Sequence, residues 1–239
     1  MRSIADQSIA QLGGSTSVLA RQRADHVELD RLLTKLDNET GEEYERTFLR
    51  MNRLVFSHAF AEEAVLWPLL RRLLPDGEQL TLQVEQEHQE VNELVVALDE
   101  HRTPGPERDR LQARLVEVLR EDVRDEEDEL LPRLQDALDA HELRRVGWQW
   151  EAVRRTAPTR PHPVVARRPP GNVVAALPLS VIDRTRDRVD MGARLAPDPV
   201  SSALRRTSQV LARLSHTVEK TPAMRRGERA STSRDPGGL

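Results

Sequence analysis

The 239-residue chain contains no cysteine and only 3% aromatic residues. Without cysteine it can form no disulfide, no thiolate zinc site and no iron–sulfur cluster, so a bound metal must take nitrogen and oxygen ligands. The absence also fits a reducing cytosol. A core built from Leu, Val and Ala with so few aromatic rings favours helices over a β-sandwich.

Long apolar runs are missing as well. No stretch of about 18 apolar residues occurs, as a membrane span needs, and the first residues lack the apolar core of a signal peptide. We therefore expect a cytoplasmic protein that makes no contact with a membrane. Charge is unevenly spread: residues 1–155 carry 21 basic and 33 acidic side chains, whereas residues 156–239 carry 15 basic and 7 acidic. This contrast indicates an acidic domain followed by a basic tail.

Helical periodicity marks four long segments, at residues 17–37, 42–74, 78–101 and 107–138. Breakers of the Pro-Asp-Gly or Pro-Gly-Pro type separate them, and short connections favour antiparallel neighbours. The predicted fold is therefore all-α: an antiparallel up-down four-helix bundle over residues 16–139, with a short fifth helix over 140–155. Residues 156–239 are predicted to form a basic, Pro-rich linker and tail, weakly helical or disordered, with disorder from residue 221.

An internal repeat relates the two halves of the predicted bundle. Glu62-Glu63-x-x-Leu66-x-Pro68 matches Glu126-Glu127-x-x-Leu130-x-Pro132 at an offset of 64 residues, and His26 matches His88 at an offset of 62. Each proline should break or kink its helix, at a cost of about 3 kcal/mol. A helix breaker that recurs at the same place in both halves indicates a duplicated helical hairpin in which the proline has the same role each time.

Six polar residues fall on the inner faces of these helices. His58 and Glu62 are spaced i, i+4, as are Asp122 and Glu126, so each pair lies on one helix face. The repeat adds one histidine from each remaining helix. The candidate metal ligands are His26, His58, Glu62, His88, Asp122 and Glu126. Burying such groups together is costly unless a cation compensates them, and imidazole with carboxylate suits iron or manganese, with zinc as another candidate.

These motifs resemble the hemerythrin-like, or HHE cation-binding, family over residues 16–139. The resemblance rests on His26-Val27-Glu28-Leu29-Asp30, His58-x-x-x-Glu62-Glu63, Glu87-His88 and Glu126-Glu127, with the two prolines. It implies a four-helix bundle around a carboxylate-bridged pair of iron ions that binds or senses O2, NO or peroxide. Family members usually have His at the position of Asp122, and the oxygen carriers have a second His at that of Asn92. These departures disfavour simple oxygen carriage and favour a labile, reactive or sensory centre.

Several alternatives remain open at this point. One is an oxidoreductase that uses the same centre to disproportionate peroxide or reduce NO, and another is a metal-free helical interaction module. Asp122 lies in an acidic run that also suits a solvated face, and Glu63 and Glu127 are predicted to point to solvent rather than to support the ligands. His101, His141, His162 and His216 are not expected to bind metal. Nucleic acid is an unlikely partner, because the tail lacks lysine clusters and interleaved aromatic residues.

Overall fold

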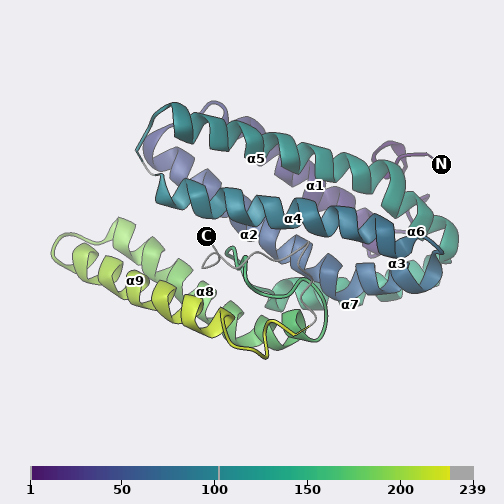
Figure 1. Ribbon diagram of the computed structural model, residues 1–239. Coiled ribbons are helices and arrows are strands. Elements are labelled where there is room, and N and C mark those ends of the chain that lie inside the picture. Colours follow the sequence, from purple (N-terminus) through teal and green to yellow (C-terminus); the bar gives the residue numbers. More distant parts are fainter. Residues whose placement is uncertain (1, 102, 227–239) are drawn as a thin grey trace.

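The computed structural model describes residues 2–101 and 103–226, which form helices and contain no strand. The predicted all-α class is therefore confirmed. Four long helical segments lie side by side (Figure 1). They are α1 (Val18–Leu36); α2 (Gly41–Ala61), which continues through η2 (Glu62–Leu66) into α3 (Trp67–Leu73); α4 (Gly77–Glu100); and α5 (Pro106–Asp125), which continues through η3 (Glu126–Leu130) into α6 (Leu131–Ala137). Among the described residues, no helix is both long and apolar enough to cross a membrane.

Local sequence explains where these helices begin. Ser17 caps α1, since its side chain accepts a hydrogen bond from the backbone N–H of Ala20. Pro106 occupies the first turn of α5, where its missing N–H costs nothing. Gly77 opens α4 at a point so close to α3 that a Cβ would lie 2.5 Å from the carbonyl oxygen of Leu70. The chain can therefore turn sharply enough for α4 to pack against α3.

The two prolines of the internal repeat do not break their helices. Instead, a π turn precedes each of them: η2 begins at Glu62 and η3 begins at Glu126. The N–H of Trp67 bonds to the carbonyl of Glu62, five residues back, and Leu131 bonds to Glu126 in the same way. Because Pro68 and Pro132 follow directly, the wider turns accommodate residues that donate no backbone hydrogen bond. Such turns are frequent at functional sites.

Apolar side chains form two clusters along the four segments. One cluster contains Leu19, Trp67 and Leu131, and the other contains Leu32, Met51 and Leu115. In every long segment, the candidate ligands fall in sequence between residues of the first cluster and residues of the second. The polar centre therefore lies between two apolar layers that exclude water from both sides.

Helix α7 (Ala140–Thr156) packs against α1, α2 and η2. Asp139 begins it with a capping box, and Gly147 lets it approach α1 so closely that a Cβ would meet the carbonyl oxygen of Thr16 at 2.2 Å. The two tryptophans of this helix face opposite ways: Trp150 is fully buried, whereas Trp148 is 61% exposed. Trp150 therefore docks the fifth helix onto the bundle.

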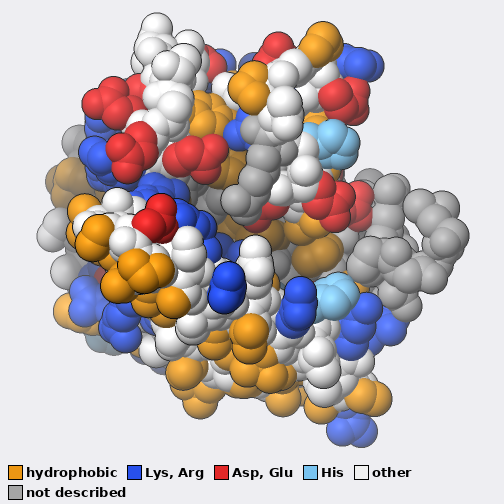
Figure 2. Space-filling model, turned by 90° about the vertical axis from the view of Figure 1, so that its left-hand side faces the viewer, with side chains coloured by type: hydrophobic (Ala, Val, Ile, Leu, Met, Phe, Trp, Pro, Cys, Tyr) orange, Lys and Arg blue, Asp and Glu red, His pale blue; other side chains and the backbone are white. Residues whose placement is uncertain are grey.

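The tail contains two long helices, α8 (Gly171–Leu195) and α9 (Val200–Glu219), which pack against each other (Figure 1). We call residues 157–170, which precede them, the connector. Much of the connector is buried, including Arg167 and Arg168, because acidic side chains of the bundle neutralise its arginines. Exposed apolar side chains gather over the helix pair, in the lower half of Figure 2. Residues 227–239, the end of the tail predicted to be disordered, lie outside the described residues.

Candidate metal centre

The structure brings the predicted ligands together in the interior of the bundle. The donor atoms form two groups, and within each group all the atoms lie within 4.8 Å of one another. His26, His58 and Glu126 form the first group, and Glu62, His88 and Glu126 form the second. Each of these side chains is at least nine-tenths buried. Because Glu126 belongs to both groups, the two candidate sites share one carboxylate.

Glu126 and Glu62 each place one oxygen near a histidine of the first group and the other oxygen near His88 of the second. In Glu126, Oε2 lies 3.2 Å from Nε2 of His26, and Oε1 lies 4.0 Å from Nε2 of His88. In Glu62, Oε1 lies 3.0 Å from Nε2 of His58, and Oε2 lies 3.6 Å from Nε2 of His88. Glu62 and Glu126 occupy equivalent positions of the repeat, so each half of the chain contributes one carboxylate that lies near both groups of histidines.

The spacing of the donor atoms suits a metal ion. Ligand atoms about 2.1 Å from an ion are about 3.0 Å apart at right angles and about 4.2 Å apart on opposite sides. The first site has His26 Nε2 and His58 Nε2 3.4 Å apart, with the carboxylate oxygens at 3.0 to 4.0 Å from these nitrogens. These separations match those expected between the ligands of one ion.

Asp122 approaches the second site from the side of α5. Its Oδ1 lies 3.6 Å from Nε2 of His88 and has no hydrogen-bond partner among the described residues. The side chain is 12% exposed, so it does not belong to a solvated acidic face. Asp122 does not complete either group of donors within 4.8 Å, so it is placed to be a peripheral fourth donor at most.

The pKa values of these groups show that the buried carboxylates require a compensating positive charge. Burial lowers the pKa of His26, but the neighbouring carboxylates of Glu126 and Glu127 outweigh burial and raise it to about 9. For His88, burial is outweighed by Asp122 and Glu63, and the pKa rises to about 10. Burial and the neighbouring Glu126 raise the pKa of Asp122 well above its usual value. Protons bound to these three side chains therefore balance the negative charge that a metal would otherwise balance, and metal binding would release them.

Behind each histidine stands a second carboxylate that accepts a hydrogen bond from Nδ1. Glu127 lies 2.9 Å from His26, Asp25 lies 3.2 Å from His58, and Glu63 lies 3.0 Å from His88. Such partners fix the ring and leave Nε2 free to bind a metal. The prediction that Glu63 and Glu127 face solvent is therefore wrong for Glu63, which is 2% exposed, and Glu127 also turns inward. His88 and Arg167 lie against Glu63, and His26 lies against Glu127.

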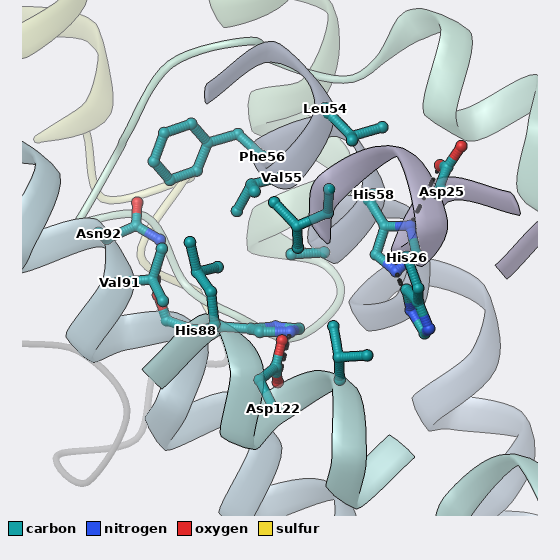
Figure 3. Close-up of a pocket in the computed structure, with 14 residues that line it drawn as sticks. Asp25, His26, Leu54, Val55, Phe56, His58, His88, Val91, Asn92 and Asp122 are labelled. Carbon is teal, nitrogen blue, oxygen red and sulfur yellow. Dashed lines mark hydrogen bonds and ion pairs between the residues drawn. The ribbon is translucent and has the colours of Figure 1, made fainter. Parts of the chain in front are cut away.

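A small cavity borders the donors on the side of the second apolar cluster. His26, His58, His88 and Asp122 line it together with apolar residues that include Val55, Phe56 and Val91 (Figure 3). The volume of this cavity is about 20 Å³, and on the same measure a single water molecule needs about 10 to 15 Å³. The space therefore accommodates one or two small molecules and nothing larger.

The remaining histidines lie outside these two donor groups. His101 and His141 are exposed, and His216 is 54% exposed at its side chain. His162 is buried in the tail, between Asp183 and Glu219. Two buried tryptophans also border the centre: Trp150 meets the His58 ring edge-on at 5.4 Å, and Trp67 stacks on His88 at 6.4 Å.

Comparisons with known proteins agree with this geometry. Residues 17–134 match the family model of the hemerythrin HHE cation binding domain. An uncharacterised hemerythrin-like protein of the yeast Schizosaccharomyces pombe is 24% identical over 156 residues, which span 64% of this chain and 77% of the yeast protein. No solved structure gives a significant match.

Proposed function

Residues 17–134 of this chain belong to the hemerythrin HHE cation-binding family, and we propose that they hold a carboxylate-bridged pair of iron ions that binds or senses O2, NO or peroxide. In this proposal the four long segments form an up-down bundle. His26 and His58 would hold one ion and His88 the other, with Asp122 as its peripheral donor, and Glu62 and Glu126 would offer oxygens to both. Manganese or zinc would fit the same nitrogen and oxygen donors.

The observation that carries the proposal is a set of buried oxygens without hydrogen-bond partners. Among the described residues, no hydrogen-bond partner is found for either carboxylate oxygen of Glu62 or of Glu126, although both residues are fully buried. The nearby imidazole nitrogens approach them as ion pairs but not in hydrogen-bond geometry. Leaving a buried carboxylate in this state costs several kcal/mol, and a pair of cations between the two carboxylates removes that cost.

The cavity beside the donors supports a small ligand. Two iron ions here would supply electrons and open coordination positions. The chain supplies apolar walls of Val55, Phe56 and Val91, which would admit a diatomic gas or peroxide and exclude larger substrates. Asn92 lies at the cavity where a further imidazole would be needed for an oxygen carrier; its side chain instead donates to the carbonyl of His88. We therefore favour sensing or reactive chemistry over oxygen transport.

Metal analysis tests the proposal directly. Protein purified from iron-supplemented cells should carry about two metal ions per chain and show near-ultraviolet charge-transfer absorption. His58→Ala should lose both, while His141→Ala, which changes an exposed histidine on α7, should keep both. Wild-type protein without iron, manganese or zinc would contradict the proposal and favour a metal-free helical interaction module.

The second candidate function is an oxidoreductase that uses the same centre, disproportionating peroxide or reducing NO. The buried Asp122 favours it, because an additional carboxylate near one ion stabilises the oxidised metal. Iron-loaded protein that evolves no oxygen from peroxide and consumes no NO would exclude this candidate and leave the binding or sensing function.

A further inference from the structure

Two arginines outside the family domain lie against the carboxylates that support the histidines. Arg154, on α7, has Nη1 3.5 Å from Oδ2 of Asp25, the partner of His58. Arg167, in the connector, has Nη1 3.7 Å from Oε1 of Glu63, the partner of His88. Each arginine is therefore two contacts away from a candidate ligand nitrogen, although both follow the matched residues 17–134.

Both arginines are held in place by further contacts. The Arg154 guanidinium lies 5.3 Å from the centroid of the Trp150 ring and pairs with Glu151 at 3.2 Å. The Arg167 guanidinium donates from Nε and Nη2 to Oε1 of Gln89, and its side chain is 10% exposed. A partly desolvated, fixed arginine interacts with a carboxylate more strongly than one in bulk water does.

The charges around the centre explain why two arginines are needed. Six carboxylates surround the two sites: Glu62, Asp122 and Glu126 among the donors, and Asp25, Glu63 and Glu127 behind the imidazoles. Two divalent ions would balance four of these charges. Two negative charges would remain inside the protein, where an uncompensated charge is costly. Asp25 and Glu63 are the two supporting carboxylates that an arginine contacts, whereas Glu127 borders an open groove where water can solvate it.

We propose that Arg154 and Arg167 are positioning residues of the metal centre, which orient Asp25 and Glu63 and offset the negative charge that two divalent ions leave. The proposal rests on the proposed function, since it requires that metal binds. It gives α7 and the connector a role beyond packing: they set the reduction potential of the centre. Loss of either positive charge favours the oxidised metal and lowers that potential.

Redox titration of the iron-loaded full-length protein tests the assignment. Arg154→Gln and Arg167→Gln should each bind two irons and have a lower midpoint potential than wild type. Arg154→Lys and Arg167→Lys keep the positive charge and should have midpoint potentials close to that of wild type. Arg155→Gln is the control for α7, because Arg155 is 74% exposed and pairs only with Glu151 among the contacts described. Arg168→Gln is the control for the connector, because Arg168 pairs with Glu85 and Glu78. Both controls should keep the wild-type potential.

A variant that changes the charge in the opposite direction separates this role from a structural one. Glu63→Gln removes a negative charge and should raise the potential, opposite to Arg167→Gln, and the double variant should return close to wild type. General loosening of the site would move both single variants in the same direction. The inference fails if wild type binds iron but the arginine variants keep its potential, or if the controls shift as far. If wild type binds no metal, the proposed function itself fails.

Discussion

Raising the pH from 6 to 10 should weaken the docking of the tail through His162. This imidazole is buried between Asp183 of α8 and Glu219 of α9, at 3.1 and 3.0 Å. Burial lowers its pKa, but the two carboxylates outweigh burial and raise the pKa from 6.5 to about 9. The native protein therefore keeps a proton that the unfolded chain loses above pH 6.5. The stabilisation is complete below that pH and is lost as the pH rises through about 9.

The size of this effect follows from the shift. At about 1.4 kcal/mol for each pH unit, the free energy of unfolding should fall by about 3 kcal/mol between pH 6.5 and 9. Histidines of the metal centre titrate in the same range, so the measurement compares wild type with His162→Gln by urea unfolding at each pH. The difference between the two proteins should be largest near pH 6 and should shrink by about 3 kcal/mol toward pH 10. A difference that does not change with pH would refute the reasoning.

Three further predictions concern the bundle. Metal at 1,000 times its dissociation constant should stabilise the protein by about 4 kcal/mol for each site, so calorimetry should show a lower melting temperature after chelation; equal melting temperatures would contradict metal binding to the native state. Gly147→Ala places a Cβ 2.2 Å from the carbonyl oxygen of Thr16 and should cost about 1 to 3 kcal/mol in urea unfolding; an unchanged midpoint would show that α7 can shift freely. Pro132→Ala restores a backbone N–H after η3, so we expect regular helix to return, Glu126 and Glu127 to turn, and iron affinity to fall about tenfold by titration. An unchanged affinity would show that the π turn does not depend on the proline.

Local signals were enough to predict the elements of the bundle. The predicted helix over residues 78–101 corresponds to α4 at Gly77–Glu100, and the segment over 107–138 corresponds to Pro106–Ala137 with its π turn. Glycine, proline and capping side chains determine such boundaries within a few residues, so sequence contains them directly. The candidate ligands came from the repeat, because equivalent positions in the two halves lie on equivalent faces.

Features that depend on distant contacts were not predictable in the same way. An ideal α-helix places Glu63 about 100° away from Glu62, and Glu63 is nevertheless buried because His88 and Arg167, from distant parts of the chain, pack against it. The connector resembled a linker because its prolines and arginines are typical of exposed chain. Its burial depends on Glu63 and Glu85, which lie far away in sequence and have no local signal.

The order of the supporting residues along the chain has a consequence for how the protein is made. His26 and its partner Glu127 are separated by 101 residues, and Arg154 and Arg167 follow later still. A polypeptide that leaves the ribosome from its N-terminus therefore exposes every donor and every supporting carboxylate before either arginine emerges. A metal ion captured at that stage would enter a more negative environment than that of the finished protein. In the proposed arrangement, the centre would therefore reach its final charge only after residue 167 has emerged.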